Sequence, residues 1–161
     1  MLSRWSRASI AMAWSAAVAF SLTGCPWSAV ETPPIGIRQV GDRIEVIVPQ
    51  CPSYGIREVE VRHRTAESGT VLWRGRHHAG AQPDILTLDE HSWEEVEGEY
   101  QLPFRMGIDV AYEGIERRIG GGASREDAAN LPTDGYKVEG SMLSADEYRD
   151  RYGDGSYCPD P

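Results

Sequence analysis

The chain contains 161 residues, a length that predicts a single folded domain. Its 25 acidic residues outnumber its 16 basic residues, so the formal net charge is −9 at pH 7. A protein with this charge repels nucleic acid and anionic lipid headgroups, which argues against a nucleic-acid-binding function.

The first 24 residues differ in composition from the rest of the chain. Met1–Arg7 carries two arginines and no acid, and Ala8–Phe20 is apolar except for two serines. A basic start, a short apolar core and a small-residue exit are typical of an export signal. The apolar segment is shorter than the roughly 20 residues of a membrane-spanning helix, and no later segment approaches that length. We therefore expect the remainder of the chain to be exported.

The exit of this leader reads Leu22-Thr23-Gly24-Cys25, which resembles the lipobox of bacterial lipoproteins. The resemblance implies that the Cys25 thiol receives a diacylglycerol and that the leader is cut just before this residue. The organisation is then a signal peptide over 1–24, a lipidated tether over 25–34 and a disulfide-closed, β-rich domain over 35–161. The alternative is an ordinary secretory signal with a chance cysteine.

The same resemblance predicts where the protein is located. It would be lipid-anchored at the cell membrane, on the extracytoplasmic face. Removing the leader leaves 14 basic and 25 acidic residues, a net charge of −11. Attachment must then come from the acyl chains, and two or more chains hold firmly where one binds only marginally.

Two cysteines remain once Cys25 is assigned to lipid. An exported protein meets an oxidising compartment, so we expect Cys51 and Cys158 to form one disulfide. The alternative is a catalytic cysteine, but each of the two has a neighbouring proline and no histidine within several residues.

Alternating apolar residues then predict a series of short strands. Ile44, Val46 and Val48 alternate with more polar neighbours up to Pro49, and Glu58–Arg62 has a clear period of two. The expected strands are Ile35–Val40, Arg43–Val48, Glu58–Arg62, Val71–Gly75, Ile85–Leu88, Glu99–Arg105, Met106–Tyr112 and Gly135–Gly140.

Two short helices are expected in the second half of the chain. One covers Ser124–Ala129 and follows Gly120–Gly122, a run that we interpret as a hairpin or loop. The other covers Ser144–Tyr152, where Ser144 and Glu147 fit a capping box and Gly153 ends the helix.

Several short strands at turn-marked spacing predict an antiparallel β-sandwich with a short C-terminal helix. The first half resembles the opening strands of immunoglobulin-like or fibronectin type III modules. It departs from true immunoglobulin domains because Cys158 lies at the chain end, directly after Tyr157. The alternative is an α+β fold in which Leu131–Tyr152 is more helical.

The histidines offer few candidates for chemistry. His77 and His78, with Asp84 and Glu90 nearby, are candidates for metal binding, since imidazole and carboxylate are suitable ligands. Adjacent residues on a strand point to opposite faces, so one zinc would need this pair in a loop. We expect exposed loop histidines and no bound metal.

Two tryptophans and an acidic cluster are candidates for recognition. Trp73 lies in an expected strand, and we expect it in the core. The alternative is that Trp93 is exposed and forms a binding patch together with Trp73. The glutamates between Glu90 and Glu99 lack the spacing of a calcium loop and indicate a solvated acidic face.

The sequence therefore predicts a lipid-anchored binding or structural protein of the bacterial cell envelope. Its ligand would be a partner protein, an envelope polymer or a small solute. No catalytic residue and no cofactor is indicated, because G-x-S-x-G and S-x-x-K are both absent. The competing hypothesis is a small envelope enzyme or metal-handling lipoprotein that uses histidine and acidic side chains.

Overall fold

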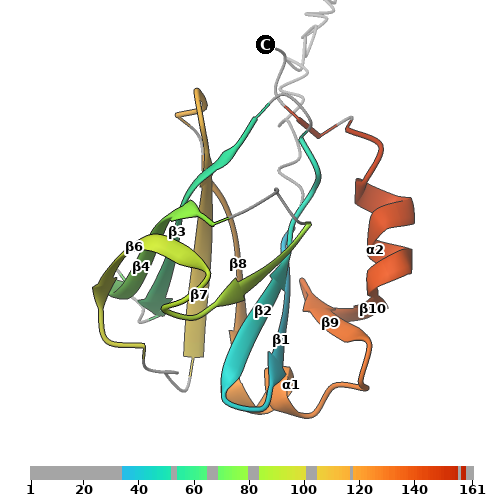
Figure 1. Ribbon diagram of the computed structural model, residues 1–161. Helices are drawn as coiled ribbons and strands as arrows, with labels where there is room; N and C mark the ends of the chain where they lie inside the picture. The colour runs from blue at the N-terminus through green and yellow to red at the C-terminus, as the bar shows by residue number, and fades with distance from the viewer. Residues whose placement is uncertain are drawn as a thin grey trace, which may run out of the picture.

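Two antiparallel five-stranded sheets pack against each other in a sandwich-like arrangement (Figure 1). The computed structural model describes residues 34–51, 54–64, 69–79, 84–100, 105–116, 118–155 and 157–158. Sheet A has the order β10 (Ser141–Ser144), β9 (Gly135–Val138), β1 (Gly36–Val40), β2 (Arg43–Ile47) and β5 (Ile85–Leu88). Sheet B has the order β6 (Trp93–Gly98), β4 (Thr70–His78), β3 (Ile56–His63), β7 (Arg105–Tyr112) and β8 (Arg118–Ser124).

The main core lies between the two sheets. Ile44 and Val46 of β2 and Val59 and Val61 of β3 are fully buried, as their alternation with polar residues predicts. Trp73 of β4 is also fully buried and meets the ring of Trp93 edge to face, with ring centroids 6.0 Å apart. These side chains remove the inner faces of both sheets from water, which is the largest stabilising contribution to such a fold.

The sheets combine strands that are far apart in the sequence. β1, β2 and β5 are neighbours in sheet A, and β4, β3, β7 and β8 are neighbours in sheet B. The immunoglobulin-like assignment stays a prediction. Two additions are visible: β6 extends sheet B beyond β4, and the β9–β10 hairpin extends sheet A beyond β1.

The two expected helices are present. α1 (Arg125–Ala129) begins after Ser124, whose hydroxyl accepts a hydrogen bond from the Asp127 amide. α2 (Ala145–Tyr152) has both arms of the expected capping box and ends at Gly153. Within the described part of the chain, neither helix has the length and apolar character needed to cross a bilayer.

α2 covers sheet A on the side away from sheet B, beside β9 and β10 (Figure 1). A second buried cluster of apolar residues lies under it: Ile47, Tyr136, Val138, Leu143 and Tyr148. The Tyr148 hydroxyl donates a hydrogen bond to the Pro34 carbonyl oxygen at 3.0 Å. This hydrogen bond holds the residue that leads into β1 against the helix.

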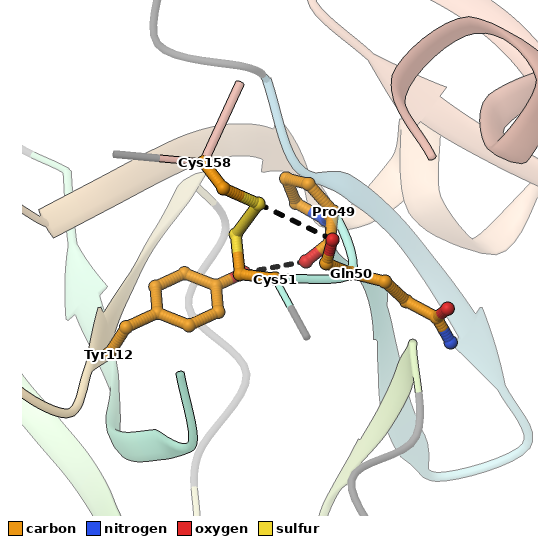
Figure 2. Close-up of a disulfide and its surroundings, with 5 residues drawn as sticks. All are labelled: Pro49, Gln50, Cys51, Tyr112 and Cys158. Atoms are coloured by element: carbon orange, nitrogen blue, oxygen red, sulfur yellow. Dashed lines mark hydrogen bonds between the residues drawn. A yellow bond between two sulfur atoms is a disulfide. The ribbon is translucent and has the colours of Figure 1, made fainter. Parts of the chain in front are cut away.

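The expected disulfide joins Cys51 to Cys158 across a sequence separation of 107 residues, with Cα atoms 5.5 Å apart (Figure 2). It ties the end of the described chain to the segment that follows β2. The Cys158 sulfur lies 3.3 Å from the Gln50 carbonyl oxygen, and the Tyr112 hydroxyl donates to the Pro49 carbonyl oxygen at 2.9 Å. Strand β7 and the C-terminal segment therefore both hold this loop in place.

Several parts of the chain differ from the sequence prediction, among them β6 and β10, which no expected strand covers. Gly120–Gly122 is not a hairpin or loop but the middle of β8, paired with Gly107–Asp109 of β7. The strand expected at Glu99–Arg105 is wrong at its start, because β6 ends at Gly98 and Glu99 and Tyr100 lie outside any strand. Gln101–Phe104 fall outside the described residues. Leu131–Tyr152 contains the β9–β10 hairpin before α2, so the α+β alternative is not adopted.

Removing the disulfide should destabilise the domain strongly. In the chain-entropy model a loop of this length contributes about 4–5 kcal/mol, because the bridge restricts the unfolded chain. We expect Cys51→Ser/Cys158→Ser to lower the urea midpoint substantially relative to the oxidised protein. Alkylation of the folded protein without reductant should label neither cysteine, and quantitative labelling of either one would contradict the bridge.

Gly75 should not tolerate a side chain. A Cβ atom at this position would lie 2.5 Å from Trp93 Cδ2 and 2.6 Å from Trp73 Cη2, both in the packed core. Gly75→Ala should therefore lower the free energy of unfolding by about 1–3 kcal/mol in a denaturant titration. Gly107→Ala is the matched control, because its Cβ would approach only Arg62 Cβ at 4.0 Å. Equal stability of the two variants would contradict the packing described here.

Candidate functional site

A cavity of about 560 Å³ lies over the outer face of β3, β7 and β8. Its floor consists of three glycines, Gly107 of β7 and Gly120 and Gly122 of β8. Arg62 and Asp109 form the wall next to this floor. Arg64, Gly69 and the β9–β10 turn at Glu139–Gly140 complete the rim. The cavity therefore spans three neighbouring strands of sheet B and reaches the hairpin that extends sheet A.

The cavity exists because glycines replace side chains on one part of a sheet face. Gly107 pairs with Gly122, and Asp109 pairs with Gly120, so three bare positions lie next to one another. Arg62 of β3 is the register partner of Gly107 on its other side, and its side chain lines the cavity next to the glycines.

Neither backbone conformation nor close packing explains Gly107. It has none of the positive φ angles recorded for five glycines elsewhere in the described chain. Nothing but the Arg62 Cβ lies within 4 Å of the position that a Cβ atom would take. Glycine within a strand lowers stability and often marks a place where a ligand or another backbone approaches closely.

The charged walls of the cavity differ in how they are paired. Arg62 Nε lies 2.8 Å from Asp109 Oδ2, and Arg62 also contacts Glu60, so this guanidinium and the Asp109 carboxylate largely neutralise each other. Arg64 and Glu139 form no ion pair with any residue that the structure describes. The Arg64 guanidinium lies over the floor, since its Nη1 atom is 2.5 Å from where a Gly122 Cβ would be.

The other part of the same face is covered by a network of ion pairs. We call this the arginine–carboxylate network; its members are Glu58, Glu60, Arg62, Arg74, Glu95, Arg76, Glu97, Asp109 and Arg118. Glu60 is at its centre, and its side chain is only 1% exposed. Arg74 contacts it at 2.6 Å from β4, and Arg118 contacts it at 2.6 Å from β8.

The electrostatics of Glu60 follow from this surrounding positive charge. Burial by itself raises the pKa of a carboxyl group, but hydrogen bonds from Arg74 and Arg62 and the charge of Arg118 outweigh it. The pKa of Glu60 is therefore held below its ordinary value of 4.5. Because Arg62 belongs both to this network and to the cavity wall, the network holds that wall in position.

The tryptophans do not form an exposed binding patch. Trp73 is fully buried and Trp93 is 4% exposed, so both belong to the core. The Trp93 indole nitrogen donates a hydrogen bond to the Thr87 carbonyl oxygen at 3.1 Å. The prediction for Trp73 is confirmed, whereas the possibility of an exposed Trp93 is wrong, because β6 folds this ring onto Trp73 and Gly75.

The histidine pair lies at the end of β4 rather than in a loop. His77 is exposed, whereas His78 packs edge to face on Trp93 with ring centroids 5.1 Å apart. Burial lowers the pKa of His78. His91 lines a second, smaller hollow of about 220 Å³ beside Asp89 and Tyr100. Among the described residues, no three histidine, cysteine or acidic side chains are grouped so that they could hold a metal ion.

The expected acidic face is only partly a free surface. Glu95 and Glu97 of β6 pair with Arg76, and Glu97 also pairs with Arg74. Cys25, the expected site of lipidation, falls outside the described residues.

Comparison with known proteins identifies no relative of this chain. No family model, no curated protein and no solved structure matches the chain.

Arg62, Arg64 and Asp109 were not predicted as site residues from the sequence. One signal was present: Glu58 and Glu60 on one expected strand and Arg74 and Arg76 on the next alternate with apolar or small residues and carry opposite signs. The cavity itself depends on bringing Gly107 beside Gly122, a pairing between separate strands that a local pattern does not reveal.

Replacing Glu60 should destabilise the domain and remove part of its sensitivity to acid. Glu60→Ala leaves three arginines without their shared partner, which we expect to lower the free energy of unfolding by about 3 kcal/mol at pH 7. The pKa of Glu60 is lower in the folded than in the unfolded protein. Glu60 therefore stabilises the folded state at pH values above its unfolded pKa of 4.5, and this stabilisation is lost as the pH falls from there through the lower folded pKa.

The measurement is the urea midpoint between pH 7 and pH 3. Glu97→Gln is the control, because the Glu97 side chain is 55% exposed and its exposed ion pairs should contribute well under about 1 kcal/mol. A Glu60→Ala protein as stable as Glu97→Gln at pH 7 would show that the network is not stabilising.

Proposed function

We propose that the protein is a lipid-anchored, extracytoplasmic binding protein of the bacterial cell envelope. The lipobox-like Leu22-Thr23-Gly24-Cys25 and the preceding leader support the anchor and the location. The Cys51–Cys158 disulfide is consistent with an oxidising compartment. The anchor would place the sandwich domain at the membrane surface, connected through the segment before Pro34.

The observation that carries the binding role is the cavity over the glycine floor. Its volume of about 560 Å³ is within the range of small-ligand sites, about 300–1,000 Å³. Charged groups of both signs converge on it, and the arginine–carboxylate network supports one of its walls. A wall that is held in place by ion pairs fits a site that is largely formed before the ligand arrives.

Binding is better supported than catalysis. The described lining of the cavity consists of arginine, acidic and glycine residues, and includes no serine, cysteine or histidine. Nucleophilic catalysis needs such a nucleophile next to a base, and the lining offers none among these residues. The cavity therefore favours recognition of a solute or of part of a larger partner.

Cys25→Ala tests the anchor. If Cys25 carries the acyl chains, the variant should be released from the membrane fraction or remain unprocessed, whereas the wild-type chain sediments with membranes. Mass spectrometry of the intact wild-type protein should show a chain that starts at Cys25 and carries added lipid.

Ser28→Ala is a matched control, three residues beyond the expected lipidation site, and should behave like the wild type. Normal processing and undiminished membrane retention of Cys25→Ala would overturn the proposed anchor.

A further inference from the structure

We infer that the cavity over Gly107, Gly120 and Gly122 binds a short zwitterionic solute, an amino acid or a di- or tripeptide with free ends. Arg64 would receive the carboxylate, and Glu139 would receive the ammonium group. This inference rests on the binding role proposed above and names the ligand class of that same site. It does not depend on the lipid anchor.

The charges at the rim carry this assignment. Arg62 and Asp109 are paired with each other at 2.8 Å, so they add little net charge. Arg64 and Glu139, which both line the cavity, have no ion-pair partner among the described residues. A ligand that brings one negative and one positive group satisfies both, whereas a simple anion or a simple cation would leave one of them unmatched.

The overall charge of the chain points to the same class. With a formal net charge of −9, the protein repels anions at long range and attracts cations to its whole surface. A zwitterion carries no net charge, so it is not repelled on approach. Its selection then depends on the local arrangement of Arg64 and Glu139.

The dimensions of the floor suit a very short peptide. The cavity extends across β3, β7 and β8, two inter-strand spacings of about 4.8 Å each. An extended chain spans at most about 3.3–3.6 Å per residue, so a di- or tripeptide fits within this width. Longer chains would have to leave the cavity at one end.

The glycine floor lets such a ligand come close to the sheet. Gly107 and Gly122 are Cα partners in the β7–β8 ladder, so the floor offers a flat surface of Cα atoms to the ligand. Recognition then comes mainly from the charged rim, with Asp109 able to accept hydrogen bonds from ligand N–H groups. This predicts strong dependence on the ligand's two charged ends and weak dependence on its side chains.

Calorimetric titration of the full chain in detergent, at low salt and pH 7, tests the inference. The probes are trialanine, N-acetyl-trialanine and trialanine amide, with alanine as a second expected ligand and tetraalanine as the length control, which should bind more weakly than trialanine. We expect trialanine to bind and each blocked form to bind about fivefold more weakly, the effect of losing one exposed ion pair of about 1 kcal/mol.

The matching variants assign each end of the ligand to its partner. Arg64→Ala should bind trialanine about fivefold more weakly and no longer distinguish it from the amide. Glu139→Gln should do the same for the acetylated form. Arg57→Ala, an exposed arginine on β3 outside the cavity lining, and Glu126→Gln, an exposed acid in α1, carry the same charge changes and should bind like the wild type.

Gly107→Leu tests the site without changing any charge. A Cβ atom at this position would approach only Arg62 Cβ, and the side chain beyond it would enter the cavity, so the variant should fold with an unchanged urea midpoint or a higher one and should lose binding because the floor is filled. Three results would overturn the inference: no binding of trialanine, affinity that depends on only one of its ends, or undiminished binding to Gly107→Leu. None of these would bear on the membrane anchor, which the fractionation of Cys25→Ala tests separately.

Discussion

The central strand β3 presents Val59 and Val61 to the apolar core and Glu58 and Glu60 to the opposite face, where both residues remain almost excluded from water. A carboxylate in that position is strongly unfavourable unless it is paired and hydrogen-bonded. The pairing comes from arginines on β4 and β8 that lie over the sheet. Because the buried carboxylates of β3 must be paired, the neighbouring strands of sheet B carry arginines on the same outer face.

The candidate site lies on the part of that face that the ion pairs of Glu58 and Glu60 do not cover. Toward β6 the outer surface is filled with paired charges, but at Gly107 and Gly122 it carries no side chains at all. Arg62 belongs to both parts and connects the stabilising network to the proposed binding cavity. The network and the cavity lining therefore share two residues, Arg62 and Asp109, and the network supports the wall of the cavity.

Much of the architecture was accessible to sequence reasoning, because local physical signals specify it. The period-two patterns of Arg43–Val48 and Glu58–Arg62 gave two central strands, and Ser144 with Glu147 gave the start of α2. Edge strands were harder to predict. β6 is rich in glutamate and β8 is rich in glycine, so neither shows the apolar alternation of a half-buried strand. Their sheet positions depend on partners elsewhere in the chain.

The sequence by itself determined the acidic charge, the β-rich class and the pairing expected for two cysteines, and it predicts a leader with a lipobox-like exit, because each is read from composition or from neighbouring residues. Only the tertiary structure decided that Trp93 is buried, that Glu60 is surrounded by arginines from three strands, and that Gly107 meets Gly122 to open a cavity. These features join residues from different strands, and which strands become neighbours is set by the packing of the two sheets rather than by any local pattern.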